Sequence, residues 1–151
     1  MRLMVDGDGS PVKEEVIRLG QRFQLPVIII TSVDHYTTKE YPPFVRLVYV
    51  DKGADRADYQ IVKEILPGDI LITQDYGLAA LVLAKKGVVL NQNGKWYTEN
   101  NINELLDLRY TSQKMRQSGV RLKGPKKRKK EDNDQFVQAL TSFLNAKQLR
   151  R

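Results

Sequence analysis

The chain has 151 residues, with 25 Lys and Arg against 18 Asp and Glu, 41% hydrophobic residues and no cysteine. This length suits one globular domain and leaves no room for a second full one. The lack of cysteine excludes disulfides and thiolate metal sites, and the single histidine argues against a His-rich metal site or a histidine-based triad. Since no apolar run approaches the roughly 20 residues of a membrane-spanning helix, we expect no membrane association and a cytoplasmic protein.

The first predicted strand, residues 2–5, leads into a helix. In the turn-rich stretch between them, Ser10 is the expected N-cap and Pro11 the first helical residue. Apolar side chains then recur at helical spacing on one face: Val12, Val16, Leu19 and Phe23. On the outer face we expect Glu14 and Arg18 to form an i, i+4 pair.

Strand and helix patterns continue to alternate along the chain. Apolar runs predict strands at residues 27–31, 45–50, 70–73 and 88–90. Helices are predicted over residues 54–66, after residue 75, over residues 99–118 and from about residue 133 onward. This alternation predicts a three-layer α/β sandwich with a mostly parallel sheet of about five strands, plus a C-terminal helical extension.

Local signals define several of these boundaries. Thr73 or Asp75 is the expected cap of the third helix, Gly87 its C′ residue, and Thr98 the cap of the fourth. Asn93 followed by glycine predicts a two-residue hairpin. Its flanking tryptophan is expected to serve packing.

The excess of positive over negative charge is confined to one end of the chain. Residues 1–118 contain 15 basic and 15 acidic side chains, whereas residues 119–151 contain 10 basic and 3 acidic ones, which accounts for the whole net charge of +7. Most of this excess comes from Lys123, Lys126, Lys127, Arg128, Lys129 and Lys130. Basic side chains release counterions from a polyanion whatever its sequence, so this basic segment predicts contacts with a nucleic-acid backbone, with a solvated connector as the alternative. We expect an α/β domain over residues 1–118, and over residues 119–151 the basic segment and a C-terminal helix packed on that domain.

Aspartates follow several predicted strands at their carboxyl ends: Asp6, Asp8, Asp51, Asp55, Asp58 and Asp75. Ligands of open parallel sheets bind at that edge, and clustered carboxylates repel one another unless a cation lies between them. Oxygen ligands select hard cations, so the pattern predicts a Mg²⁺ or Mn²⁺ site suited to phosphodiester hydrolysis. The alternative is that these aspartates only cap helices, although Asp6 and Asp8 cannot both cap the same one. Gly7 and Gly9 are also compatible with a phosphate cradle.

At these residues the chain resembles the YaiI/YqxD family of bacterial proteins, which is assigned a PIN-like fold. The resemblance runs through residues 5–13 (VDGDGSPVK), 53–58 (GADRAD), 68–75 (GDILITQD), 97–102 (YTENNI) and 123–128 (KGPKKR). It implies an acidic site made of Asp6, Asp8, Asp55, Asp58 and Asp75. The PIN-like relationship implies, by analogy, metal-dependent ribonuclease chemistry. Ser10 stands where the family usually has cysteine, and Tyr59 stands where another aspartate often follows, which leaves one carboxylate fewer for a second metal ion.

Three functions are compatible with these features. The first is a Mg²⁺- or Mn²⁺-dependent nuclease acting on RNA, with catalysis assigned to Asp6, Asp8, Asp58 and Asp75 and metal binding to Asp6, Asp55, Asp58 and Asp75. The second is a non-catalytic RNA- or ribosome-binding protein whose acidic cluster is structural. The third is a phosphatase with an aspartate nucleophile in the Asp-x-Asp after the first strand.

Overall fold

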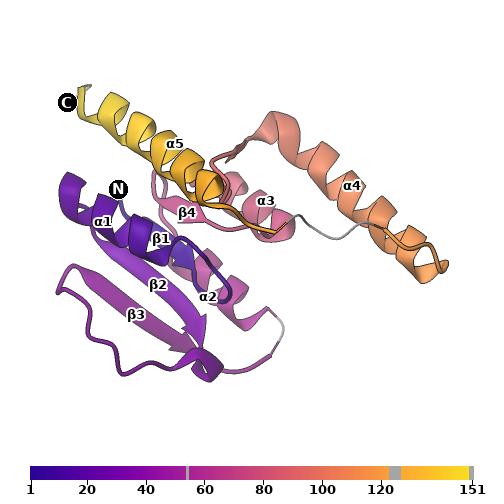
Figure 1. Cartoon of the computed structure of the whole chain (residues 1–151), viewed down its shortest axis with the longest axis horizontal. Coiled ribbons are helices and arrows are strands. Elements are labelled where there is room, and N and C mark those ends of the chain that lie inside the picture. The colour runs from indigo at the N-terminus through magenta and orange to yellow at the C-terminus, as the bar shows by residue number, and fades with distance from the viewer. Residues whose placement is uncertain (54, 123–126, 150–151) are drawn as a thin grey trace.

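The computed structural model describes residues 1–53, 55–122 and 127–149. The elements in chain order are β1 Leu3–Asp6, α1 Lys13–Phe23, β2 Val27–Ser32, the short 3₁₀ turn η1 Val33–His35, β3 Val45–Val50, α2 Arg56–Glu64, β4 Ile70–Ile72, α3 Tyr76–Ala84, β5 Val88–Leu90, β6 Trp96–Tyr97, α4 Glu99–Gln117 and α5 Lys130–Leu149 (Figure 1). The predicted alternation of strands and helices is therefore confirmed.

The strands of the described residues form one sheet in the order β3-β2-β1-β4-β5-β6. β1 to β5 pair in parallel, and β6 runs antiparallel to β5. The sixth strand is the second arm of the predicted hairpin, whose Gly94 has a φ of +87°. The chain reverses its winding direction between β1 and β4, which makes that junction the topological switch point of the sheet.

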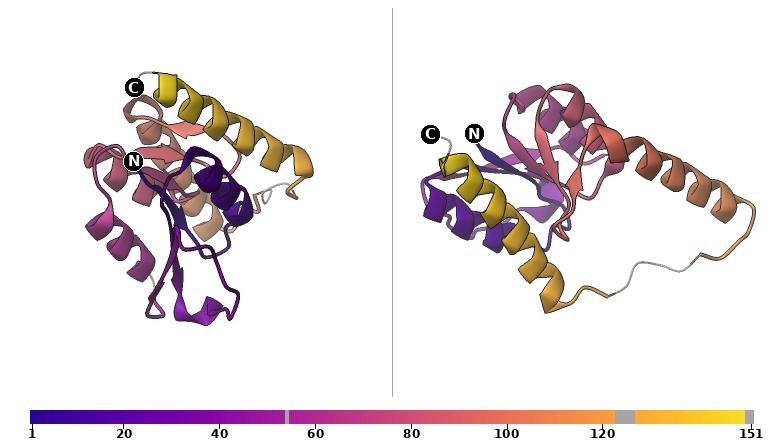
Figure 2. Two further views of the ribbon diagram at one scale, coloured as in Figure 1. Left: turned by 90° about the vertical axis from the view of Figure 1, so that its left-hand side faces the viewer. Right: turned by 90° about the horizontal axis from the view of Figure 1, so that it is seen from above.

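Helices cover both faces of the sheet, which confirms the three-layer α/β arrangement (Figure 2). Alternate strand residues such as Val5 and Ile29 pack with α1 and α5 in one core cluster. Their neighbours such as Met4 and Ile28 pack with α2, α3 and α4 in the other. The central strands are apolar on both faces because each face is covered by helices.

The predicted helix starts are right for α3 and α4 and wrong for α1. The Asp75 carboxylate accepts a hydrogen bond from the Leu78 amide at the start of α3, and Thr98 forms a capping box at the start of α4. Helix α1 instead begins at Lys13 and its N-cap is Val12, while the buried Ser10 hydroxyl has no hydrogen-bond partner among the described residues. The stretch before Lys13 remains in turn conformation, so Ser10 and Pro11 lie outside the helix.

Two further local predictions are wrong. The left-handed position after α3 is taken by Lys86, with a φ of +66°, and not by Gly87. Gly87 is required for another reason, because a Cβ there would lie 2.5 Å from a Val82 methyl group. Glu14 pairs with Lys39 from the loop before β3, and Arg18 reaches Glu15 at 3.5 Å instead.

Helix α5 is fixed to the β5–β6 hairpin and to α1. Phe136, Leu140 and Leu144 are buried in the core cluster of α1. Trp96 packs against Phe143 with ring centroids 4.8 Å apart, as expected of a packing residue. At the hairpin tip, a Cβ on Gly94 would lie 2.6 Å from a carbonyl oxygen of α5, so only glycine allows this close approach.

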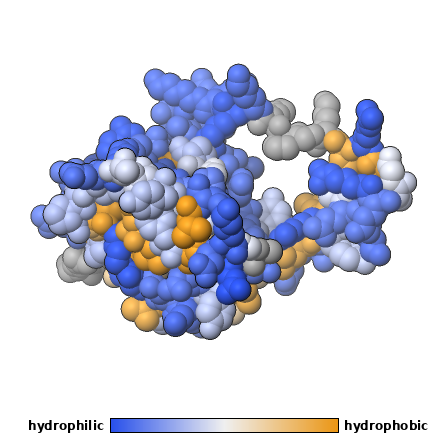
Figure 3. Space-filling model, turned by 90° about the horizontal axis from the view of Figure 1, so that it is seen from below, coloured by the Kyte–Doolittle hydropathy of each residue, from blue (hydrophilic) through white to orange (hydrophobic). Residues whose placement is uncertain are grey.

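Helix α4 projects from the body along its C-terminal half (Figures 1 and 2). Ile102 in its first turn is buried, whereas Leu108 and Tyr110 are each 62% exposed. Orange residues are visible among blue ones on this projection in Figure 3. The apolar pattern over residues 99–118 predicted the helix correctly, but only its first turns contribute to the core.

Candidate functional site

Asp6 and Asp75 lie at the switch point between β1 and β4. Asp6 is the last residue of β1, and its Oδ2 accepts a hydrogen bond of 2.9 Å from the Thr73 hydroxyl. The same hydroxyl oxygen accepts a hydrogen bond of 3.0 Å from the Asp75 amide. Thr73 is buried directly after β4, so it links the ends of two neighbouring strands and orients the Asp6 carboxylate.

The Asp75 carboxylate has two partners within the described residues. Its Oδ1 accepts the capping hydrogen bond from the Leu78 amide at 3.1 Å and lies 3.4 Å from a guanidinium nitrogen of Arg109. Arg109 comes from α4, so the fourth helix contributes to the site. Both contacts use Oδ1, and Oδ2 takes no part in them.

Asp8 is held by β2 and the turn that follows it. Its Oδ1 accepts hydrogen bonds from the Thr31 hydroxyl at 2.5 Å and from the Ser32 amide at 3.0 Å, and His35 lies 3.8 Å away. Partial burial opposes ionisation, but these hydrogen bonds and the histidine outweigh it, so the pKa of Asp8 is lowered. Gly7 permits the approach to β2, since a Cβ there would lie 2.9 Å from the Ile30 carbonyl oxygen.

Asp6 and Asp58 have the opposite shift. Burial, which the hydrogen bond from Thr73 only partly offsets, raises the pKa of Asp6, and the charges of Asp75 and Asp8 add to this effect. Burial also raises the pKa of Asp58 to about 6, together with the charges of Asp75, Asp6 and Asp55 and against the opposing charge of Arg109. Each of these two carboxyls therefore holds its proton more tightly than a solvated carboxyl does.

The predicted carboxylates divide between two hollows. The smaller, about 190 Å³, is lined by Asp6, Asp8, Ser10, Ile72, Thr73, Gln74, Asp75 and Gln92. The larger, about 560 Å³, is lined by Asp55, Asp58, Tyr59, Val62, Asp75, Gly77, Leu78, Leu81 and Arg109. Asp75 lines both, so the two hollows are neighbours. Asp51 follows β3 at the far edge of the sheet, two strands from β1, and lines neither hollow.

Helix capping does not account for most of these aspartates. Of the five residues of the implied acidic site, only Asp75 accepts a capping hydrogen bond among those found in the described residues. Asp55 is the N-cap of α2 by position, but its φ is +66° and its side chain makes no cap hydrogen bond. Within residues 1–53, 55–122 and 127–149, no group of three or more His, Asp or Glu side chains is disposed to hold a metal ion.

The basic segment is only partly described, because Lys123 and Lys126 lie outside the described residues. Lys127, Lys129 and Lys130 are exposed. Arg128 instead donates hydrogen bonds to the Asn133 side chain at 2.7 Å, to the Gln92 carbonyl at 2.7 Å and to the Asn93 side chain. Arg128 thus fastens the chain before α5 to the hairpin turn, and Gln92 also lines the smaller hollow.

Sequence reasoning did not identify Arg109, Thr73 or Gln92 as site residues. The signal for Arg109 was present, since it lies seven residues after the buried Ile102 and therefore on the same face of α4. Thr73 was considered only as a helix cap. Gln92 carried no signal, because its position depends on how the hairpin folds back onto the sheet.

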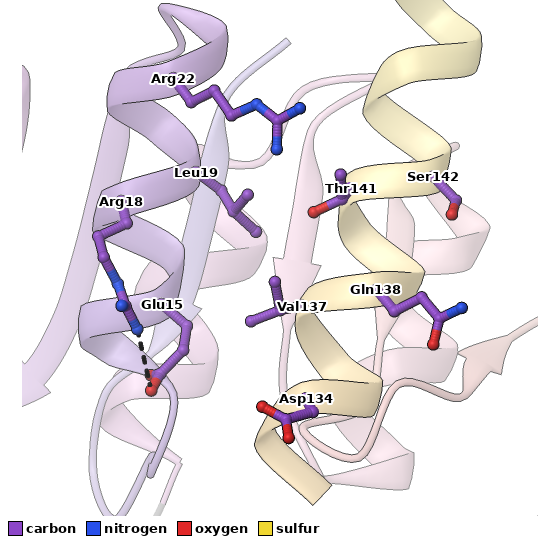
Figure 4. Close-up of a pocket in the computed structure, with 9 residues that line it drawn as sticks. All are labelled: Glu15, Arg18, Leu19, Arg22, Asp134, Val137, Gln138, Thr141 and Ser142. Atoms are coloured by element: carbon purple, nitrogen blue, oxygen red, sulfur yellow. Dashed lines mark ion pairs between the residues drawn. The ribbon is translucent and has the colours of Figure 1, made fainter. Parts of the chain in front are cut away.

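A further hollow of about 600 Å³ lies between α1 and α5 (Figure 4). It is lined by Glu15, Arg18, Leu19, Arg22, Asp134, Val137, Gln138, Thr141 and Ser142. None of the predicted acidic site residues reaches it, because the α1 and α5 layer covers the opposite face from α2 and α3. It is therefore separate from the candidate site.

No helix among the described residues has both the length and the apolar composition required to cross a bilayer.

Comparisons with known proteins identify the family to which the chain belongs. A model of the uncharacterised YaiI/YqxD family matches residues 4–146. A UPF0178 protein of Enterococcus faecalis is 56% identical over 144 residues, covering 95% of this chain and 97% of its own. A UPF0178 protein of Bacillus cereus is 45% identical over 144 residues, covering 95% and 99%. A crystal structure of Rae1 (YacP) from Bacillus subtilis aligns with 97% of this chain and 99% of its own at 16% identity and a TM-score of 0.43. The resemblance seen in the motifs is thus confirmed over nearly the whole sequence, and the chain belongs to the YaiI/YqxD family.

Proposed function

We propose that this protein is a Mg²⁺- or Mn²⁺-dependent nuclease that acts on RNA. The observation that carries the proposal is the smaller hollow at the switch point, where Asp6 and Asp8 from the end of β1 come together with Asp75 from the segment after β4. Open parallel sheets bind their ligands at this place, and two of the three carboxylates have pKa values shifted by their surroundings.

The residues of the smaller hollow fit a hard cation. Apart from Ile72, every residue that lines it carries a side-chain oxygen, and the buried Ser10 hydroxyl has no hydrogen-bond partner in the described part of the chain. Mg²⁺ usually keeps several waters and takes only one or two carboxylates, so it does not require a cage of three acidic side chains. Asp6 and Asp75 are the proposed direct ligands, with Asp8 and Ser10 in support through water. A bound ion of this kind polarises a phosphoryl oxygen and activates water for attack at phosphorus.

The protein's own residues prepare this chemistry. The hydrogen bond from Thr73 fixes the Asp6 carboxylate. The hydrogen bonds from the Leu78 amide and the Arg109 guanidinium fix the Asp75 carboxylate. Asp8 stays ionised because Thr31 and Ser32 donate to it, so it is suited to accept a hydrogen bond from a water molecule in the hollow. Such preorganised groups avoid the cost of reorientation during reaction.

The fixed position of Arg128 supports a nucleic-acid backbone as the substrate class. Because Arg128 donates to the carbonyl of Gln92, the segment that carries Lys127, Lys129 and Lys130 is anchored beside the smaller hollow. These exposed lysines would offset the repulsion between a phosphate backbone and the aspartates.

A cleavage assay tests this function. We expect labelled single-stranded RNA to be cleaved in Mn²⁺ and not in EDTA. The Asp6→Asn variant keeps an acceptor for Thr73 and should lose activity by about 100-fold or more, an effect typical of removing a group that stabilises the transition state. Asp51→Asn removes the same charge outside both hollows and should retain full activity. Equal cleavage by the wild type and Asp6→Asn would identify a contaminating nuclease and reject the proposal.

A non-catalytic RNA-binding protein is the second candidate. It is favoured by the engagement of Asp75 with Arg109 and by the lack of a three-carboxylate group among the described residues. Salt-dependent RNA binding without turnover in either Mg²⁺ or Mn²⁺ would support this candidate over the nuclease.

A further inference from the structure

The larger hollow combines two chemical surfaces. It opens between α2, α3 and α4, and Asp58 and Asp75 line it together with the apolar side chains of Val62, Leu78 and Leu81. Its volume of about 560 Å³ falls in the range of small-molecule sites. A site for a metal ion needs only the carboxylates, so the apolar wall and the volume of this hollow suggest a larger ligand.

Two of its apolar side chains are unusually exposed. Tyr59 is 71% and Leu81 55% exposed, and they come from neighbouring helices that line the same hollow. Both would lose solvent contact if a flat apolar group entered. Gly77 lines the same hollow and adds no side chain to its wall.

The larger hollow adjoins the proposed catalytic hollow, because Asp75 lines both. A phosphate placed beside Asp6 and Asp75 would therefore have a neighbouring nucleotide at the mouth of the larger hollow. Arg109 lines the larger hollow and is 48% exposed, and within the described residues it uses one nitrogen on Asp75, so other donors of its guanidinium remain for a phosphate or a base edge.

From these contacts we infer that the larger hollow is a subsite for one unpaired nucleobase, with Tyr59 as the stacking platform and Val62, Leu78 and Leu81 as the apolar wall. The inference rests on the proposed function, since the adjacent phosphate is the one to be cleaved. A base is uncharged and planar, so it suits a wall that a phosphate would avoid. Because only an unstacked base can enter, the substrate is single-stranded RNA and not a duplex.

A binding experiment that does not depend on cleavage tests this subsite. A short 2′-O-methyl single strand with one 2-aminopurine is titrated in Mg²⁺ with the full-length protein. We expect stacking to quench the fluorescence with the wild type and with Tyr59→Phe. Tyr59→Ala should lose the quenching and bind about tenfold more weakly, within the range measured for single base–aromatic stacks. Tyr110→Ala is the matched control, because Tyr110 is also well exposed but lines neither hollow.

The outcomes separate this inference from the nuclease proposal. Quenching that depends on Tyr59 without any RNA cleavage would keep the subsite and reject the nuclease. Metal-dependent cleavage with identical binding by wild type, Tyr59→Ala and Tyr110→Ala would keep the nuclease and reject the subsite. Binding of an arginine-rich peptide that requires Asp58 and excludes the oligonucleotide would also reject the subsite, since the occupant would then be a protein cation.

Discussion

The pKa of the Asp58 carboxyl is set by the groups around it. Burial and three neighbouring carboxylates raise its pKa to about 6, although Arg109 is near. In the unfolded chain the carboxyl has its ordinary pKa near 4. The folded state therefore binds this proton more tightly, and the ionised folded form carries an electrostatic cost that is complete above pH 6 and absent below pH 4.

Replacing Asp58 by asparagine should stabilise the protein at pH 8 in the presence of EDTA. The expected gain is about 1 kcal/mol, reduced from the full shift because the side chain is partly exposed to solvent. The gain should disappear as the pH falls from 6 to 4, where the wild-type carboxyl is protonated. Urea unfolding at several pH values measures it, with Asp51→Asn as control for the change in net charge. A constant difference at all pH values would contradict the electrostatic origin.

The ion pair of Arg2 with Asp69 is a residue-scale feature that the sequence did not predict. Asp69 is 3% exposed and accepts hydrogen bonds from the backbone and the guanidinium of Arg2 and from the Leu66 amide. Hydrogen bonding by Asp69 raises the pKa of Arg2 against the opposing effect of burial. Removing the guanidinium leaves the buried Asp69 carboxylate with two backbone amide donors and no opposite charge.

We expect Arg2→Met to lower the free energy of unfolding by about 3 kcal/mol, the lower end of the range for a broken buried pair. Lys52→Met, which breaks the exposed pair of Lys52 with Asp34, should leave the free energy of unfolding nearly unchanged. Chemical denaturation of both variants measures the difference. Equal small effects would mean that water replaces Arg2 around Asp69.

At the scale of elements, the sequence predicted most helices and strands because their signals are local. Asp75 and Thr98 carry their capping function in their own residue types and neighbours. The failure at Ser10 has a tertiary cause, because Gly7 and Asp8 tie the turn to β2 and the helix starts only after it. The exposure of Leu108 and Tyr110 in the outer part of α4 is also a tertiary feature, which the helical spacing of the sequence does not reveal.

Within the basic segment, Arg128 has a structural role that the exposed lysines do not share. Arg128→Ala should destabilise the protein by about 1–3 kcal/mol, because hydrogen bonds from a charged group to the hairpin and α5 are lost. Lys129→Ala, at an exposed neighbouring position, should leave the melting temperature within about 1 °C. Thermal unfolding followed by circular dichroism compares them. Equal melting temperatures for the two variants would contradict the role of Arg128 as a fastener.

At the scale of the whole molecule, the sequence predicted the layers and the edge where the carboxylates lie, but not their grouping. Which aspartates meet depends on the strand order, and that order places β1 beside β4 and sends β3 to the far side. Asp6 and Asp75 therefore meet, while Asp51 is left apart. Arg109 joins them from the fourth helix, a contact between residues 34 positions apart that no local pattern specifies.

The exposed lysines of the basic segment lead to a prediction about RNA affinity. Replacing Lys127, Lys129 and Lys130 together by glutamine should weaken binding to single-stranded RNA and reduce the slope of log K against log salt by about 2, which corresponds to three phosphate contacts. The fold should be unaffected because all three side chains are exposed. Fluorescence anisotropy at several salt concentrations measures the slope. An unchanged slope would assign the phosphate contacts to other residues.

The projection of α4 has a consequence for local opening. Beyond its first turns, this helix has few tertiary contacts, so its outer backbone hydrogen bonds break and reform without disturbing the sheet. Amide protons near Tyr110 and Met115 should therefore exchange with deuterium far sooner than those of β1. Arg109 stands at the boundary between the fraying part and the anchored part, which makes the lifetime of its contact with Asp75 a measure of how firmly the helix is seated.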